Sequence, residues 1–484
     1  MRTASVFILL MVLASLTAGG QAAGMNESRL HRDFRVEKES LASCTNFAKL
    51  MDCGQTLVTG QPMHIAVGSL APQNGVGFGL AFVEHKNFAN EWRASWDVDA
   101  VATLNNSWRA GAYMKAFRLP GGTVYRTAPL INLYSQSTSL NRVDYYGLGP
   151  DTTPTTHATY GFSENITGAN VAIPCGGTLH RAGIAAVAEV NGRFPSVRPG
   201  TDSHLPSATA LFSETSAPGL FHQSPFIQAS EGLRIGPTLF KDHIRLNYLV
   251  QFQQFISPGD STYSFRRFNG DFSHEIPLYN LLPGKLGKAY YPNRAALFPH
   301  TGPDDCTATN AERNISRQRA ASADAKSDPA RPCPIVATTD KLEGSITLRA
   351  YLSESIAGSG SVVPFYFMPT LGGSDINGTR MLASYPDYRF RAPNLLLFRG
   401  TLEHSIGKLP LGMIFSVDES KVGLRRDDVS VDHLRHTFSA GVTLRAGGLP
   451  LIYLEFAWGG KEGNHTTTAI SPTLLGSSSR PALF

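Results

Sequence analysis

The sequence predicts an all-β protein: a transmembrane antiparallel β-barrel of sixteen strands, with long extracellular loops and a short N-terminal helical segment. Three observations support this prediction. Apolar and polar residues alternate with a period of two along many segments, and many of these segments reach about nine residues or more, close to the length of a tilted membrane strand. Beyond the N-terminus, no window of about 18 residues is continuously apolar, so the sequence offers no transmembrane helix.

The N-terminus predicts export. Arg2 precedes an apolar run from Val6 to Leu16, and the small residues TAGGQAAG follow it. This order is typical of a secretory signal peptide, which we assign to residues 1–22. A membrane anchor is disfavoured because the apolar run covers only about half of the roughly 20 residues that a helical span requires.

An exported chain meets an oxidising compartment, in which cysteines can form disulfides. The cysteines are odd in number, so at least one thiol stays free or pairs with another chain. Cys306 and Cys333 lie in a long polar stretch and could close it as a disulfide; the alternative is two unpaired thiols. The cysteines are Cys44, Cys53, Cys175, Cys306 and Cys333.

Residues 23–74 form an N-terminal segment that we place in the periplasm or inside the barrel. A helix is predicted from Arg35 to Asp52, and Cys44 could pair with Cys53 only if that helix ends between them. The segment could be a periplasmic stub, a plug of the lumen or a hook for a periplasmic partner. The sequence does not choose among these roles, and a short helix packed on the barrel rim is the plainest outcome.

The alternation gives each predicted strand one apolar and one polar face. In EWRASWDVDAVATL, Trp96 and Val98 share a face that Asp97 and Asp99 do not. The same division recurs in DHIRLNYLVQFQQF, GSITLRAYL, TFSAGVTLRAG and LIYLEFAW. A soluble sandwich would also alternate, but the polar faces carry Arg, Asp, Glu and Gln, which suit a hydrated lumen. Aromatic residues also stand near strand ends, as in an interfacial girdle: Trp92, Trp108, Tyr134 and Trp458.

The barrel is assigned to residues 75–484, with strands from about Val76 onward. Tight connections such as LNNS and AGGLP alternate with longer polar ones, such as Phe194 to Pro225 and Pro299 to Thr339. We expect the short turns on the periplasmic side and the long loops, including Pro299 to Thr339, outside the cell. The last predicted strand contains Pro472, which fits only at an edge or a bulge, so we expect weak closure between the first and last strands.

The stretch from Val363 to Val422 contains a distinctive series of short motifs. In chain order they are Leu371-Gly372-Gly373, Arg389-Phe390-Arg391, Asn394, Glu403, Asp418 and Lys421-Val422. Earlier segments add YYGLGPDT, APGL, and YSFRRF followed by IPLYN. This combination resembles the BamA/TamA outer-membrane assembly superfamily, also called the bacterial surface antigen family, over most of the chain from residue 75.

The resemblance implies that this stretch is an extracellular loop folded back into the barrel, where an arginine of a four-residue motif pairs with acidic groups on the inner wall. Aligned on Tyr385, Ala383 stands where the family has that arginine and Ser384 where it has glycine. We therefore expect one of the other loop arginines to supply the charge for two wall carboxylates; alternatively the lumen is wet enough that they need no cation. The predicted loop residues and partners are Tyr385, Asp387, Arg389, Arg391, Glu403, Asp418 and Arg380.

The resemblance also implies a function: insertion or translocation of proteins at the outer membrane of a Gram-negative cell, gated by the inward loop and by a labile contact between the first and last strands. The implied partners are outer-membrane lipid, unfolded outer-membrane or exported polypeptides, and a periplasmic protein. Family members carry POTRA domains, for which residues 23–74 are too short. The alternative is therefore a passive pore or structural barrel that has lost assembly activity.

Other functions find no support in the sequence. The net charge of +5 comes without a Lys/Arg run or a basic stripe, which argues against a nucleic-acid partner. The chain contains no HExxH, CxxC or GxSxG motif, and its histidines are scattered. We therefore predict no enzymatic activity, no metal site and no cofactor.

Overall fold

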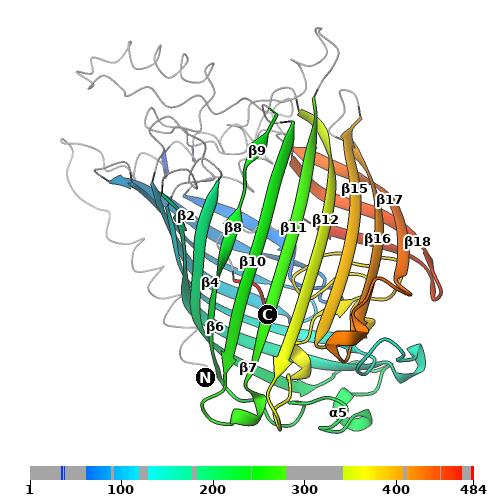
Figure 1. Cartoon of the computed structure of the whole chain (residues 1–484). Coiled ribbons are helices and arrows are strands. Elements are labelled where there is room, and N and C mark those ends of the chain that lie inside the picture. Colours follow the sequence, from blue (N-terminus) through cyan, green and yellow to red (C-terminus); the bar gives the residue numbers. More distant parts are fainter. Residues whose placement is uncertain are drawn as a thin grey trace, which may run out of the picture.

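Each long strand pairs antiparallel with the strand before it and the strand after it, and the resulting sheet curves round into a barrel (Figure 1). The computed structural model describes residues 34–35, 38, 62–88, 92–118, 129–176, 183–240, 243–279, 342–406, 411–446, 449–470 and 481–483. The sheet has seventeen strands. Because β8 and β9 both pair with β10, one after the other, these strands occupy sixteen positions around the barrel. This confirms the predicted fold class.

The strands of the barrel are β1 (Met63–Ser69), β2 (Val76–Phe88), β3 (Trp92–Ala102), β4 (Trp108–Arg118), β5 (Leu130–Tyr145), β6 (Ala158–Pro174), β7 (Ile184–Pro199), β8 (Phe226–Ile235), β9 (Thr238–Leu239), β10 (Ile244–Ile256), β11 (Phe265–Tyr279), β12 (Leu342–Ala357), β15 (Asn394–Ser405), β16 (Leu411–Gly423), β17 (Arg435–Ala446), β18 (Leu449–Gly460) and β19 (Gly463–Ile470). A separate two-stranded sheet joins β13 (Thr370–Leu371) to β14 (Phe390–Arg391).

The barrel strands turn apolar side chains outward and polar side chains inward. On β3, Asp97 and Asp99 are 5% and 2% exposed, whereas Val98 between them is 38% exposed. On β18, Glu455 is 2% exposed and its neighbour Phe456 is 48% exposed. The apolar faces therefore cover the outside of a single barrel, as lipid requires, and are not buried between two stacked sheets.

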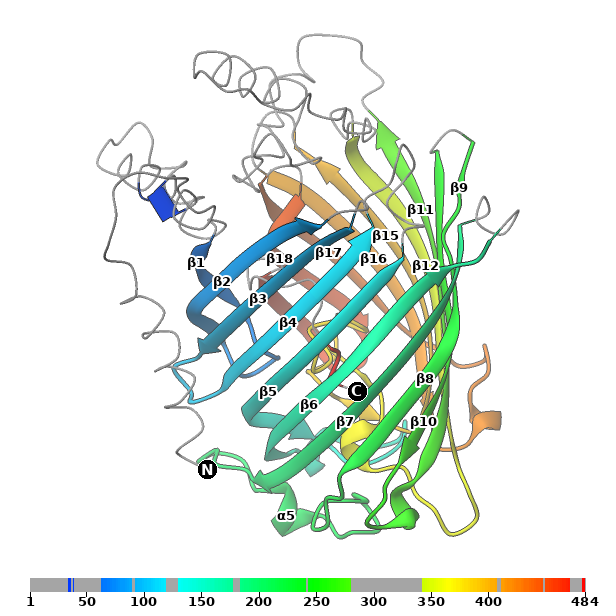
Figure 2. The ribbon, with the colours of Figure 1, turned by 90° about the vertical axis from the view of Figure 1, so that its left-hand side faces the viewer.

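The strand order defines two rims of the barrel. We call the rim where β1 begins at Met63 the N-terminal rim, and the rim where β1 ends at Ser69 the far rim. Since successive strands run in opposite directions, Tyr279, Leu342 and Ile470 all lie at the N-terminal rim. The far rim carries the connection between β7 and β8 with its short helix α5 (Ala208–Leu211), which Figure 2 shows at the bottom of the barrel.

The strand order corrects the predicted placement of two connections. The tight turns LNNS and AGGLP lie at opposite rims, since the first follows β3 and the second follows β17. The segment Pro299 to Thr339 lies outside the described residues, but its flanking strands β11 and β12 end and begin at the N-terminal rim.

The sequence analysis also did not recognise the strand β1. The barrel begins at Met63 rather than at residue 75, because MHIAVGS pairs with β2 from Met63↔Phe82 to Ser69↔Val76. Ala66 and Gly68 make its alternation weak. The side of each connection was predicted from its length and not from strand order, and for this reason both tight turns were placed on one side.

The first and last strands of the barrel, β1 and β19, lie close to each other. β19 ends at Ile470, before Pro472, which lies outside the described part of the chain. β1 and β19 come near each other, but their described residues form no backbone register with one another, whereas β1 pairs with β2 and β19 pairs with β18 along their lengths. We call this place the seam.

Helical structure is sparse in the part of the chain that the structure describes. Within the predicted helix Arg35 to Asp52, Arg35 and Lys38 are helical and the remainder lies outside the described residues. Short 3-10 turns cover Pro154–Thr156 (η5), Ser261–Tyr263 (η6), Phe365–Phe367 (η9) and Arg426–Asp428 (η10). Among the described residues, no helix is both long enough and apolar enough to cross a membrane.

Candidate functional site

The connection between β12 and β15, residues 358–393, runs into the barrel and is called the lumen segment. Figure 2 shows it in yellow, enclosed by the wall strands. It contains η9, β13 and β14, and its two short strands pair through Thr370↔Arg391 and Leu371↔Phe390. Most of its side chains are buried, including Tyr366, Leu382 and Tyr388 at 1% exposure or less. The lumen segment is thus a packed internal element.

The Leu-Gly-Gly motif forms a tight crossing inside this segment. Gly372 and Gly373 have positive φ angles of 104° and 56°, a conformation that L side chains rarely adopt. A Cβ on Gly373 would lie 2.1 Å from Asp387 Oδ1, and one on Gly372 would lie 2.6 Å from Arg389 Cβ. Glycine is required at both positions because the returning strand passes directly over them.

An aromatic cluster closes the barrel toward its far rim. Phe365, Tyr366 and Phe367 of η9 are fully buried and meet rings that point inward from the wall strands. Ring centroids lie 5.1 Å apart for Tyr145 and Phe365 and 4.9 Å apart for Phe226 and Phe367. Further members on the wall are Tyr160, Phe162, Phe255, Tyr263 and Phe265. These rings bury a large apolar area where the sequence analysis expected a wet lumen.

Arg389 anchors the lumen segment to two loops of the far rim. Its Nε donates to Glu462 Oε2 (2.7 Å), and its Nη1 donates to Thr152 Oγ1 (2.7 Å). The guanidinium also lies 5.0 Å from the ring centre of Tyr146 and 4.6 Å from that of Phe390. The side chain is 1% exposed. Charge-assisted hydrogen bonds of this kind are stronger than neutral ones.

Arg391 holds the segment together internally. Its Nη1 donates to the carbonyl oxygen of Phe365 (2.8 Å), and its guanidinium lies 5.7 Å from the ring centre of Tyr145. Its own carbonyl accepts from the backbone N–H of Gly149 (2.7 Å). A backbone carbonyl and aromatic rings, rather than an acidic wall residue, therefore bind this arginine.

We expected loop arginines to pair directly with the wall carboxylates Glu403 and Asp418. This prediction is wrong, because both carboxylates pair with arginines of the wall. Asp418 forms a two-point pair with Arg399 of β15, at 2.6 Å for both contacts, and Glu403 pairs with Arg445 of β17 at 2.7 Å. Wall arginines thus pair with both carboxylates, one from the adjacent strand and one from two strands away. Register explains one pair, because Arg399 stands directly opposite Asp418.

Two links still join the segment to this acidic wall. Asp418 Oδ2 accepts from the backbone N–H of Leu382 (2.8 Å), a residue with a left-handed φ of 53°. Arg380 pairs with Glu455 of β18, and its guanidinium lies 4.6 Å from the ring centre of Tyr453. The loop cation therefore reaches the wall, but at Glu455, which the sequence analysis did not name.

Tyr385 and Asp387 contact the segment's own backbone and the rim. The Tyr385 ring packs against Phe390 with centroids 5.2 Å apart. Asp387 Oδ1 accepts from the backbone N–H of Ser374 (2.9 Å), and its Oδ2 accepts from Gln73 Nε2 (2.6 Å). Gln73 lies in the turn between β1 and β2, so Asp387 connects the segment to a strand of the seam.

Ala383 and Ser384 occupy the two positions at which the sequence resemblance would place an arginine and a glycine. Ala383 is 3% exposed and Ser384 is completely buried. The Ser384 hydroxyl forms a 2.7 Å hydrogen bond with Thr437 Oγ1 of β17. A neutral side-chain contact therefore stands next to the position at which the family's motif would place its cation.

Two carboxyl groups of the segment have perturbed acidities. Burial raises the pKa of Asp375 to about 6, against hydrogen bonds from the backbone N–H groups of Thr379 (2.7 Å) and Asn377 (2.9 Å) that favour the charged form. Burial also raises the pKa of Asp387, although the Ser374 N–H opposes the rise. Protonation of these groups therefore favours the docked segment.

No model of a known protein family matches the chain, and no curated protein matches it. Solved structures do match. BamA from Haemophilus ducreyi lacking POTRA domains 1–3 aligns with a TM-score of 0.45 and 10% identity, over 84% of this chain and 68% of that one. CdiB from Acinetobacter baumannii gives 0.43 and 8% over 85% of this chain, and CdiB from Escherichia coli gives 0.45 and 9% over 84%.

The present chain spans 60% and 62% of the two CdiB chains, which is less than two thirds of their length. With TM-scores below 0.5, these likenesses assign no activity to it.

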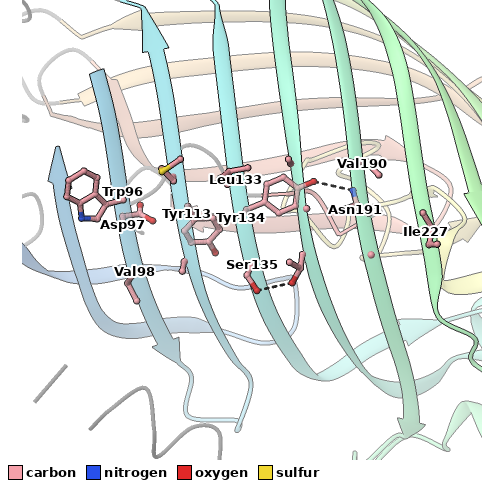
Figure 3. Close-up of a pocket in the computed structure, with 16 residues that line it drawn as sticks. Trp96, Asp97, Val98, Tyr113, Leu133, Tyr134, Ser135, Val190, Asn191 and Ile227 are labelled. Carbon is pink, nitrogen blue, oxygen red and sulfur yellow. Dashed lines mark hydrogen bonds between the residues drawn. The ribbon is translucent and has the colours of Figure 1, made fainter. Parts of the chain in front are cut away.

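A hollow separate from the lumen segment lies on the outer face of the barrel (Figure 3). It has a volume of about 800 Å³ and crosses β3 to β8. Its exposed lining side chains, Val98, Leu133, Val190 and Ile227, all belong to the outward set. Gly192, which has no side chain, leaves room between them. This hollow faces lipid and is separate from the lumen segment.

Several residues of the site have no signal that would single them out in the sequence. Glu462 and Gln73 lie in short connections remote from the lumen segment along the chain, and only the barrel brings them to it. Thr152 ends the segment YYGLGPDT, which the sequence analysis named without assigning a contact to it. Cys306 and Cys333 lie outside the described residues; Cys175 is a free thiol. In the described part of the chain, no group of three or more His, Cys, Asp or Glu is placed to hold a metal ion.

Proposed function

We propose that this chain is an outer-membrane barrel that takes part in inserting or translocating proteins at that membrane, after removal of the signal peptide 1–22. The observation that carries the proposal is the lumen segment itself. It packs inside the barrel and is tied by polar contacts to β16, to β17 and to the loop between β5 and β6, while no backbone register joins the described residues of β1 and β19. A barrel with a packed internal segment and an unpaired seam is suited to letting a polypeptide pass sideways through its wall when the segment moves.

The lumen segment acts as the gate in this proposal. In the closed state, Arg389, Arg391 and the aromatic cluster hold it in place. Opening requires the release of the Arg389 contacts to Thr152 and Glu462 and the withdrawal of η9 from its ring partners. Asp387 bonds to Gln73, beside β1, so movement of the segment is mechanically connected to the seam. The proposed mechanism uses no catalytic residue and no cofactor.

The outward apolar faces support the membrane location. Phe78 and Leu80 on β2 are each 58% exposed, and they would be costly to leave in water. The two rims are assigned by the N-terminal segment: if it is periplasmic, the far rim with the aromatic cluster is extracellular.

The alternative is a passive pore or a structural barrel. Fully buried rings at the far rim oppose a permanently open pore, since a solute would have to displace them. Conductance of the purified full chain in planar bilayers separates the two. The proposal expects a mostly closed barrel with rare openings; a steady channel that passes solutes would favour the pore.

A crosslinking experiment tests the assembly function directly. A photoreactive residue at Ile65, which faces outward on β1 at 38% exposure, should capture unfolded polypeptides in cells. The matched control places it at Leu348, which is 51% exposed on β12 and distant from the seam. Equal capture at the two positions, or none at Ile65, would contradict the proposal.

A further inference from the structure

A short stretch beyond the last strand lies inside the barrel. Pro481–Leu483 contact the inner wall and the lumen segment, and the C-terminal label stands within the barrel in both whole-molecule views (Figures 1 and 2). Leu483 is 5% exposed and belongs to the same apolar core as Ile376 and the aromatic cluster. We call these three residues the tail peptide. Its hydrogen bonds involve neither the Arg389 contacts of the lumen segment nor the strands of the seam.

Asn377 of the lumen segment recognises the backbone of the tail peptide. Its Oδ1 accepts from the backbone N–H of Leu483 (2.8 Å), and its Nδ2 faces the carbonyl oxygen of the same residue at 3.5 Å. A side-chain amide thus presents an acceptor and a donor to one residue, as the edge of a β-strand does. Recognition of this kind reads an extended backbone and not a particular side chain.

Arg193 of β7 supplies the second contact. Its Nη2 donates to the carbonyl oxygen of Ala482 (3.0 Å). Two further donors of this guanidinium bind wall side chains: Nε donates to Gln228 Oε1 (2.6 Å) and Nη1 donates to Glu164 Oε1 (3.1 Å). Arg193, Gln228 and Glu164 are each at most 3% exposed. A buried network of hydrogen bonds therefore orients the Nη2 donor of Arg193 toward the carbonyl oxygen of Ala482.

The site buries one side chain of the tail peptide and leaves the neighbouring one exposed. Leu483 is buried in the apolar core, whereas Ala482 is exposed. An aliphatic side chain at the position of Leu483 is stabilised by the removal of its apolar surface from water. The site therefore selects an extended peptide with one aliphatic residue, bound through its backbone.

We propose that the lumen contains a peptide-binding site formed by Asn377, Arg193 and the apolar core around Leu483, and that the chain's own tail peptide occupies it. The ligand class is an extended segment with an aliphatic side chain at the Leu483 position. This site exists whether or not the barrel inserts or translocates proteins, so its test does not depend on the proposed function.

Disulfide trapping tests the docked position. The variant carries Asn377→Cys and Leu483→Cys in a full chain whose five native cysteines are serine, and it is examined in detergent micelles. We expect efficient crosslinking under mild oxidation. The control pairs Asn377→Cys with Ala482→Cys, whose side chain points away, and should crosslink at least about tenfold less. Because these changes remove contacts of the site, a companion measurement uses hydrogen exchange of the Leu483 backbone N–H, which donates to Asn377 Oδ1. Corrected for intrinsic rates, this N–H should exchange slowly in the unmodified chain and in Ala482→Asp, and at least about tenfold faster in Asn377→Ala. Failure of the first pair, or equal crosslinking of both, would overturn the proposal.

Competition tests recognition. The probe is a fluorescent synthetic peptide with the sequence RPALF of residues 480–484, and its binding to the full chain is measured by anisotropy. Leu483→Asp should vacate the site and bind the probe at least about tenfold more tightly than the unmodified chain. Ala482→Asp puts the same charge on the exposed neighbour and should behave like the unmodified chain.

Adding Asn377→Ala to Leu483→Asp should abolish the gained binding, because the backbone partner is then lost. A probe with aspartate in place of its leucine should not bind. If Leu483→Asp gains no affinity, or if the double variant binds as well as the single one, there is no such site.

Discussion

Replacement of Arg389 by methionine measures how strongly the lumen segment is held. The change removes the hydrogen bonds to Thr152 and Glu462 and keeps an unbranched side chain that can still pack on Tyr146 and Phe390. A hydrogen bond to a charged group contributes about 1.5–3 kcal/mol net. The Glu462 side chain is 19% exposed, so water can replace part of the lost contact.

We therefore expect the free energy of docking to fall by about 2–3 kcal/mol in total. Hydrogen exchange of docked backbone amides reports this quantity, since exchange requires local opening. The N–H groups of Tyr388, bonded to Gly372 O (3.1 Å), and Met381, bonded to Gly373 O (2.9 Å), are suitable probes. They should exchange about 30- to 150-fold faster in Arg389→Met.

The matched control is Arg426→Met at the far rim. Arg426 is 59% exposed and pairs with Glu354, and an exposed pair of this kind contributes at most about 1 kcal/mol. If Tyr388 and Met381 exchange no faster in Arg389→Met than in Arg426→Met, Arg389 does not anchor the segment and the gate described above is incorrect.

Three further outcomes follow from the same contacts. Phe365→Ala should weaken docking by about 3–5 kcal/mol, because it leaves a cavity in the aromatic cluster, and Phe365→Leu should cost clearly less; equal exchange rates at Met368 in the two variants would contradict this. Because burial raises the pKa of Asp375 to about 6, its contribution to docking is complete below its unfolded pKa near 4 and is lost as the pH rises through about 6. Amide exchange corrected for intrinsic rates should show this dependence between pH 5 and 7.5, and Asp375→Asn should remove it. Orientation can be tested with a membrane-impermeant maleimide. Cys175, at the N-terminal rim, should react only after the outer membrane is permeabilised, whereas Thr262→Cys, at the far rim, should react in intact cells. The reverse pattern would show that the barrel has the opposite orientation.

The strand pattern was predictable because it is local. In a sheet, successive side chains point to opposite faces, so the alternation around Val98 and Phe456 appears in the sequence and survives in the fold. The direction of each strand was not predictable in the same way. It depends on the number of strands that precede it, and the weak strand β1 was missed; the length of a connection does not report its side, since LNNS and AGGLP lie at opposite rims.

The candidate site divides along similar lines. The lumen segment could be located from its motifs, and the crossing at Gly372 and Gly373 explains why glycine stands there. The partners of its charges could not be found, because they depend on register between strands. Arg399 meets Asp418 only because β15 and β16 align in one particular way, and that pair removes the need for a loop cation.

The amino-acid sequence by itself determined which side chains face lipid and which face inward, since that choice depends only on residues two apart. Only the tertiary structure decided what lies inside. Closing the sheet brings Thr152, Glu462 and Gln73 to the lumen segment, and it sets Arg193 and Asn377 on either side of Leu483. Contacts between residues hundreds of positions apart depend on the curvature and register of the whole sheet, which no local pattern encodes.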